Sequence, residues 1–239
     1  MILFIADLHL SPERPDIFEA FRRFMTTEAP KAEALYVLGD LFEAWIGDDD
    51  NSTFNQAVIA LFKANADQGV AQFFVHGNRD FLIGKRFAKA AGMTLLPETA
   101  VIDLYGTSAL VMHGDTLCTL DTDYQAFRKK SRSKFWQWRM QLLPLWLRRR
   151  IARKARAKSQ ASNAMKSDAI MDVTPAEVDN VIAKYQVPLL IHGHTHRPNR
   201  HQHPGAERIV LGDWYEQGSV LVVTPNSISL EKRPFEKSA

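Results

Sequence analysis

The chain has 239 residues, 46% of them hydrophobic, so it can bury a full core, and we expect one domain over residues 1–239 rather than two. A single cysteine, Cys118, excludes an internal disulfide framework and favours a reducing compartment. No apolar stretch reaches the roughly 20 residues of a transmembrane helix, and Met1 to Asp7 is expected to form a strand rather than a signal peptide.

The net charge of +3 conceals a segregation of charge along the chain. Of the 30 lysines and arginines, 14 lie between Tyr124 and Ser167, where there is no aspartate or glutamate. The remainder carries 16 basic against 27 acidic residues. Such segregation indicates an anionic partner for the basic segment, and the alternative is a solvated helical surface.

Strand and helix patterns alternate in the first half of the chain. Apolar, β-branched or aromatic runs predict strands at Ile2–Ala6, Ala34–Leu38, Ala71–Val75 and Ser108–Met112. Apolar residues at helical spacing predict helices at Ile17–Met25, Phe54–Phe62 and Phe81–Ala91. This alternation favours βαβ units.

The end of the chain is predicted to be rich in antiparallel strands. A capping-box pattern at Thr174–Glu177, with Pro175 at the first helical position, predicts that a helix begins there. Strand-like runs follow at Leu189–Ile191, Arg208–Leu211, Ser219–Val223 and Ile228–Leu230. Pro225-Asn226 is expected to turn the last two runs into a hairpin, and His201 and His203 are expected in a solvated loop.

The segment from 121 to 167 interrupts this pattern. It is basic, contains several tryptophans, and carries the apolar run Leu142–Leu147, which Pro144 breaks. We therefore expect an insertion of two or more helices that forms a lid beside the functional site.

Seven potential metal ligands follow predicted strands in five short clusters. The clusters are Asp7-x-His9, Gly39-Asp40, Gly77-Asn78, His113-Gly114 and Gly193-His194-Thr195-His196. Because each follows the carboxyl end of a strand, we expect the side chains to converge on one rim of a sheet. Carboxylates, imidazoles and an amide suit a divalent ion such as Mn²⁺, Fe²⁺ or Zn²⁺, and seven ligands suit two ions that share a bridging carboxylate.

Other polar residues favour simpler interpretations. Asp48-Asp49-Asp50 is predicted to be a polar loop tip, and His76 and His192 to be hydrogen-bonded histidines of the core. Asp115 either orients His113 or is an ordinary turn residue.

The order of the five clusters resembles the calcineurin-like metallophosphoesterases, whose pattern is D-x-H, G-D, G-N-[HR], H and G-H-x-H. The resemblance implies an α/β fold, a two-sheet β-sandwich flanked by helices. It implies that one ion takes Asp7, His9, Asp40 and His196. The other would take Asp40, Asn78, His113 and His194, so that Asp40 bridges the two. A hydroxide between the ions would then be the nucleophile.

Arg79 stands where most members of this group have a histidine. Arginine does not give up a proton, but it can hold a phosphate oxygen and neutralise developing charge. A phosphate leaving group needs little protonation, so Arg79 favours cleavage of a pyrophosphate over an alkyl phosphodiester. The alternative is a surface arginine paired with Asp80.

Within this group, the chain resembles one family in more detail, namely the UDP-2,3-diacylglucosamine hydrolases of lipid A synthesis in Gram-negative bacteria. The motifs are Gly39–Asp49, Gly77–Asp80 and the basic tryptophan-rich insertion. The resemblance implies a cytoplasmic pyrophosphatase, peripheral on the inner face of the inner membrane, that uses two Mn²⁺ to form UMP and 2,3-diacylglucosamine 1-phosphate. It implies catalytic roles for Asp40, Asn78 and Arg79, and substrate contacts at Asn78, Arg79, Asp121, Ser159, Asn163, Lys166 and His194.

The expected partners and two alternative functions complete this interpretation. We expect a monomer. We also expect no binding of nucleic acid, because the positive charge is confined to one insertion rather than spread along a groove. A nuclease or cyclic-nucleotide phosphodiesterase of the same group is the competing enzyme, and a metal-free interaction scaffold is the competing non-enzyme.

Overall fold

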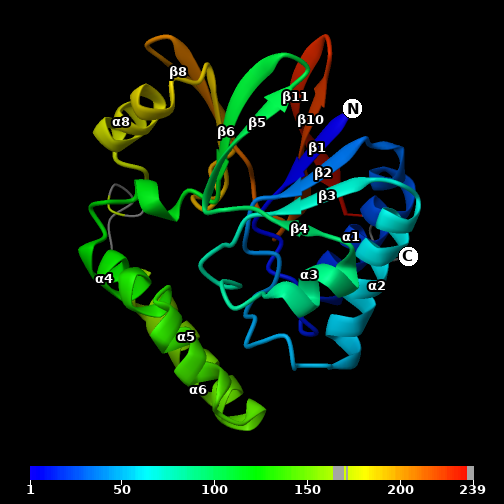
Figure 1. Cartoon of the computed structure of the whole chain (residues 1–239), viewed down its shortest axis with the longest axis vertical. Coiled ribbons are helices and arrows are strands. Elements are labelled where there is room, and N and C mark those ends of the chain that lie inside the picture. The colour runs from blue at the N-terminus through cyan, green and yellow to red at the C-terminus, as the bar shows by residue number, and fades with distance from the viewer. Residues whose placement is uncertain (164–169, 171, 236–239) are drawn as a thin grey trace.

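The computed structural model describes residues 1–163, 170 and 172–235, and it confirms the α/β two-sheet sandwich (Figure 1). The first sheet has the strand order β11-β10-β1-β2-β3-β4. Its strands are β1 (Ile2–Ile5), β2 (Ala34–Val37), β3 (Ala71–Phe74), β4 (Thr94–Leu95), β10 (Gln217–Thr224) and β11 (Ser227–Pro234). β1 to β4 are parallel, and β10 and β11 form the predicted hairpin, in which Thr224 pairs with Ser227.

The second sheet has the strand order β5-β6-β7-β9-β8. Its strands are β5 (Thr99–Leu104), β6 (Thr107–Met112), β7 (Leu189–His192), β8 (Asn199–His203) and β9 (Ala206–Val210). β7 runs parallel to β6 and β9, so the prediction of an antiparallel tail was wrong for this strand, whereas β8 and β9 pair antiparallel. The prediction of a solvated loop was also wrong, because His201 and His203 lie on the edge strand β8 and are half-buried.

The alternation of side chains along β1 shows how the layers are built. Leu3 and Ile5 point to one face, where they join the core formed with the outer helices. Ile2 and Phe4 point to the other face and pack with residues of the second sheet. Both faces of this strand are buried, which explains its continuous apolar sequence.

Three helices cover the outer face of the first sheet, namely α1 (Pro15–Thr27), α2 (Thr53–Asp67) and α3 (Lys85–Ala91). α3 begins at Lys85, whereas the sequence predicted Phe81. The carboxylate of Asp48 accepts hydrogen bonds from the amides of Gly84, Arg86 and Phe87 at 2.9, 3.0 and 3.0 Å, which fixes the start of the helix. Asp48 is therefore a helix cap, not part of a free loop tip.

The described part of the predicted insertion, residues 121–163, contains three helices, α4 (Thr122–Ser131), α5 (Lys134–Gln141) and α6 (Leu145–Asn163). They lie at the lower left of Figure 1, and α6 packs against the loop that follows β2. The chain then returns through α8 (Pro175–Tyr185), which begins where the capping pattern predicted, although the Thr174 hydroxyl bonds to that of Thr119 at 2.7 Å instead of capping the helix. Among the described residues, no helix is both long and apolar enough to span a bilayer.

Candidate active site

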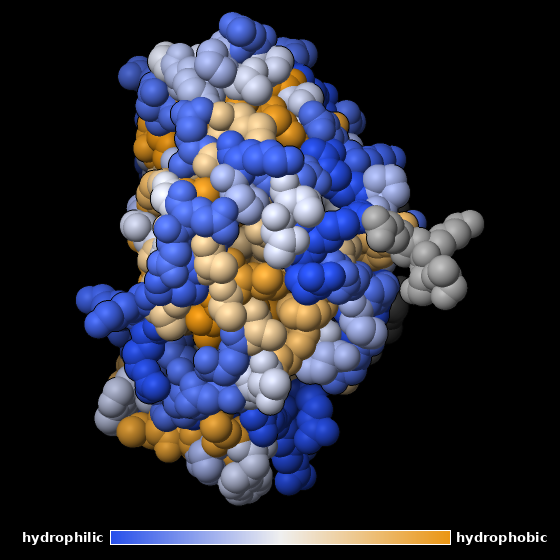
Figure 2. Space-filling view, turned by 90° about the vertical axis from the view of Figure 1, so that its right-hand side faces the viewer, coloured by the Kyte–Doolittle hydropathy of each residue, from blue (hydrophilic) through white to orange (hydrophobic). Residues whose placement is uncertain are grey.

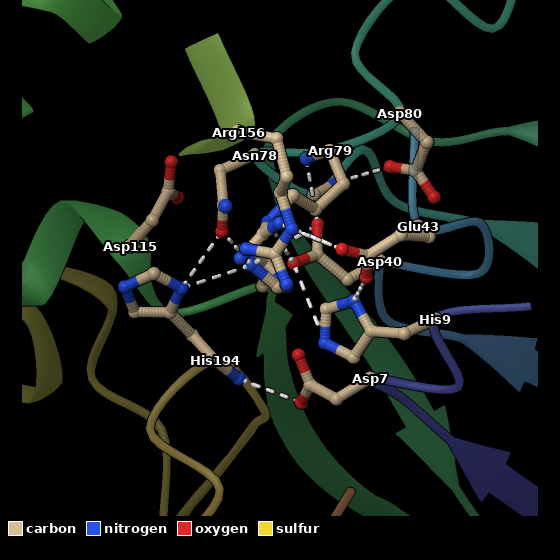
Figure 3. A network of polar contacts seen from close by, with 12 residues as sticks. Asp7, His9, Asp40, Glu43, Asn78, Arg79, Asp80, Asp115, Arg156 and His194 are labelled. Carbon is tan, nitrogen blue, oxygen red and sulfur yellow. Dashed lines mark hydrogen bonds and ion pairs between the residues drawn. The ribbon is translucent and has the colours of Figure 1, made fainter. Parts of the chain in front are cut away.

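All seven predicted metal ligands lie together at one rim of the sandwich, beyond the carboxyl ends of β1, β2, β3, β6 and β7. Figure 3 labels Asp7, His9, Asp40, Asn78 and His194 among them, contributed by loops of both sheets. Glycines permit this convergence. A Cβ at Gly77 would lie 2.1 Å from Asp40 Oδ1, and a Cβ at Gly193 would lie 2.3 Å from Asp7 Oδ2. The glycines in these clusters therefore allow close approach of neighbouring loops.

One set of donors is formed by His9, His196, Asp7 and Asp40. His9 Nε2 lies 3.2 Å from His196 Nε2, and His196 Nε2 lies 3.5 Å from Asp7 Oδ1. His9 Nε2 is 3.9 Å from Asp40 Oδ2. Asp7 Oδ1 is buried and has no hydrogen-bond partner among the described residues. Ligands about 2 Å from one ion are roughly 3–3.5 Å apart, so this set fits a divalent cation.

A second set is formed by Asn78, His113, His194 and the other oxygen of Asp40. Asn78 Oδ1 lies 2.9 Å from both His113 Nε2 and His194 Nδ1, and these nitrogens are 3.1 Å apart. His113 Nε2 is 3.8 Å from Asp40 Oδ1. His113 Nδ1 donates to the Leu38 carbonyl at 2.8 Å, which leaves the Nε2 lone pair for the site. The Asn78 oxygen and the two imidazole nitrogens thus converge on one point, and this arrangement of donor atoms fits a second cation.

Burial and neighbouring charges shift the pKa values of several metal-ligand candidates. Burial opposes protonation of His196, but the carboxylates of Asp7 and Asp213 outweigh it and raise its pKa to about 10. Burial tends to raise the pKa of Asp7, but His196 lowers it well below its usual range. Burial and the nearby His113 lower the pKa of His194 to about 4. The first donor set thus attracts a positive charge, which a metal ion would supply in place of the proton.

Two carboxylates that the sequence analysis did not single out hold the outer nitrogens of metal-ligand candidates. Asp213 Oδ2 lies 3.1 Å from His196 Nδ1, and Glu43 Oε2 lies 3.3 Å from His9 Nδ1. Such carboxylate partners orient metal-binding imidazoles and raise their basicity. Asp115 does not play this part for His113, because the Leu38 carbonyl already accepts from His113 Nδ1. Asp115 instead accepts bonds from Tyr124 and Arg128 of the insertion at 2.6 and 2.8 Å.

Arg79 points into the site, which excludes the interpretation as a surface arginine paired with Asp80. Its amide donates to Asp40 Oδ1 at 2.8 Å, and its Nη1 lies 3.4 Å from Glu43 Oε1. Asp80 is fully buried and accepts from the amides of Leu41 and Gly77 at 2.7 and 2.8 Å. Burial and the nearby Asp40 raise the pKa of Asp80 to about 7.

Acidic residues of the core neutralise several arginines of the basic segment. Arg148 is 2% exposed and donates to the Ile46 carbonyl at 2.7 Å and to Asp49 Oδ1 at 2.8 Å. Arg149 pairs with Asp50 at 2.7 Å. Asp49 and Asp50 are therefore docking residues for α6, not a solvated loop tip. Part of the positive charge that predicted an external anionic partner is used inside the molecule.

The predicted substrate contacts are spread over the rim and the insertion. Asn78, Arg79 and His194 lie in the ligand cluster. Asp121 caps α4 by accepting from the Tyr124 amide at 3.2 Å. Ser159 is half-buried on α6. The side chain of Asn163 and all of Lys166 lie outside the described residues.

Comparison with known proteins identifies the family to which this chain belongs. Residues 1–198 match the model of the calcineurin-like phosphoesterase family. The chain is 54% identical over 98% of its length to UDP-2,3-diacylglucosamine hydrolases from Vibrio parahaemolyticus, Photobacterium profundum and Escherichia coli, and it covers 98%, 98% and 99% of those proteins. The chain therefore belongs to the calcineurin-like phosphoesterase family and groups within it with the UDP-2,3-diacylglucosamine hydrolases.

Proposed function

We propose that this chain hydrolyses the pyrophosphate bond of UDP-2,3-diacylglucosamine, an intermediate on the way to lipid A, to give UMP and 2,3-diacylglucosamine 1-phosphate. The observation that carries the proposal is the position of Arg79 beside two convergent sets of metal donors, in a chain similar over nearly its whole length to hydrolases of that name.

The donor sets would hold two divalent cations, which we propose to be Mn²⁺. Asp40 directs one carboxylate oxygen toward each set and is the proposed bridge. When bound, the cations would neutralise phosphate charge and activate water. Asp40 also holds the Arg79 amide, and so positions the arginine that would bind a phosphate oxygen. Asn78 would bind a cation and contact the substrate.

The insertion presents apolar side chains to solvent. Five large hydrophobic residues on it are 46–65% exposed, namely Phe127, Phe135, Trp138, Leu142 and Trp146. Figure 2 shows apolar surface at the lower end of the molecule, where the turn between α5 and α6 lies in Figure 1. We propose that this face receives the acyl chains and rests on the inner face of the inner membrane, so that residues 121–167 act as a lid on a monomeric, peripheral enzyme.

A comparison of substrates tests the proposal. Protein reconstituted with Mn²⁺ is expected to cleave UDP-2,3-diacylglucosamine at least about 100-fold more efficiently than UDP-N-acetylglucosamine, because the acyl chains align the pyrophosphate. Single-stranded DNA and cyclic nucleotides are expected to remain intact. Equal efficiency on the two UDP-sugars, or faster cleavage of a nucleic acid, would refute it.

A further inference from the structure

Arg156 reaches the ligand cluster from the insertion. Its side chain is 21% exposed, and its Nε forms an ion pair with Glu43. Figure 3 shows the Arg156 side chain reaching toward Glu43, the carboxylate that also contacts Arg79. Arg156 therefore brings a positive charge to the site from a segment more than 70 residues away in sequence from Arg79.

Contacts between α6 and the loop that follows β2 determine where Arg156 lies. Arg149 is two helical turns earlier on the same face of α6, and it pairs with Asp50. Arg156 pairs with Glu43, which belongs to the same core loop. Arg148 anchors the helix to this loop through Ile46 and Asp49. These ion pairs therefore hold α6 against the loop that follows β2 at several points along the helix.

Glu43 is shared between two arginines. Its Oε1 lies 3.4 Å from Arg79 Nη1 and also pairs with Arg156. Within the described part of the chain, Glu43 is the only hydrogen-bond or ion-pair partner of Arg156. A guanidinium has five N–H donors, so one carboxylate satisfies only part of its capacity.

We infer that Arg156 is a second phosphate-binding arginine of this site, which Glu43 holds beside Arg79 until the pyrophosphate of the substrate binds. The inference rests on the function proposed above. The two phosphates of a UDP-sugar each carry a negative charge, and arginine binds phosphate oxygens in a bidentate manner. Exchange of a carboxylate for a phosphate leaves the partly buried guanidinium of Arg156 paired in both states.

Substitution of Arg156 with a matched control tests the inference. Arg156→Gln is expected to lower kcat/KM for UDP-2,3-diacylglucosamine on the order of 100-fold, as for loss of one preorganised charge stabiliser. Arg156→Lys is expected to recover part of this loss, because it keeps the charge but not the bidentate geometry. Arg153→Gln removes the same charge from an exposed position one turn earlier and is expected to stay within about twofold of wild type. Bound manganese, measured by elemental analysis, is expected to be equal in all variants.

A double-mutant cycle with Glu43→Gln separates phosphate binding from simple neutralisation of Glu43. If Arg156 binds phosphate, Arg156→Gln lowers kcat/KM by a similar factor in the wild-type and Glu43→Gln backgrounds. If Arg156 only neutralises Glu43, the substitution has no further effect in the Glu43→Gln background, and the inference is overturned. It is also overturned if Arg156→Gln alone stays within threefold of wild type. A wild-type protein that leaves the substrate intact would instead refute the proposed function.

Discussion

The anchor between Arg148 and Asp49 predicts that two adjacent aspartates differ sharply in their contribution to stability. Asp49→Ala removes both carboxylate oxygens from the Arg148 guanidinium, which is 2% exposed, and leaves it the Ile46 carbonyl as its one partner among the described residues. Asp50→Ala removes the partner of Arg149, whose side chain is 52% exposed and can return to water.

The magnitude follows from the exposure of each pair. Loss of one partner of a fully buried ion pair costs about 3–5 kcal/mol. Loss of an exposed pair costs about 0–1 kcal/mol. Arg148 is buried but Asp49 is 46% exposed, so we expect about 2 kcal/mol for Asp49→Ala. For Asp50→Ala we expect less than about 1 kcal/mol.

Hydrogen exchange of the α6 amides measures this difference directly, because the helix opens when its anchor is lost. About 2 kcal/mol corresponds to roughly 30-fold faster exchange in Asp49→Ala, while Asp50→Ala is expected to change it less than about fivefold. Amides of β1 serve as the internal control and should be unaffected. Equal exchange rates of α6 in the two variants would show that burial of Arg148 does not determine how the insertion is held.

Three further predictions concern the site. Asp40→Asn is expected to keep the fold, as measured by circular dichroism. It is expected to retain less than about a tenth of wild-type kcat/KM with Mn²⁺ present, because it weakens the proposed bridge between the two donor sets. Higher activity would contradict the bridge. Arg79→His is expected to bind metal normally and to lose about 10²–10³-fold in kcat, whereas an unchanged rate would remove Arg79 from the mechanism. Chelation with EDTA is expected to abolish hydrolysis and to lower the melting temperature, and added Mn²⁺ is expected to restore both. Activity in protein that elemental analysis shows to be free of manganese, iron and zinc would exclude metal dependence.

The metal-ligand candidates were predictable from sequence because each follows a strand whose apolar pattern is visible locally. Asp7 follows β1 and His194 follows β7, and the carboxyl ends of these strands meet at one rim whatever the length of chain between them. The two-sheet fold and the hairpin of β10 and β11 were likewise indicated by local patterns and family resemblance.

Contacts between distant segments were not predictable in the same way. Glu43 and Asp213 are ordinary acidic residues among 27, and only the folded chain places them against imidazole nitrogens. The pairing of Arg148 with Asp49 spans 99 residues, so an excess of charge in one segment indicated a partner without revealing that the partner was internal. The late start of α3 depends on a cap from Asp48, 37 residues before Lys85.

The backbone at the site has a consequence for the choice of inactive variants. Five of the seven metal-ligand candidates have positive φ angles between 50° and 70°, namely Asp7, His9, Asp40, His194 and His196. Asparagine, aspartate and histidine adopt this left-handed conformation more readily than other residues with a Cβ. An alanine at one of these positions would therefore remove a ligand and also disfavour the loop conformation that holds its neighbours. Asparagine changes the ligand while it keeps the loop conformation accessible, so it distinguishes lost metal binding from a displaced loop.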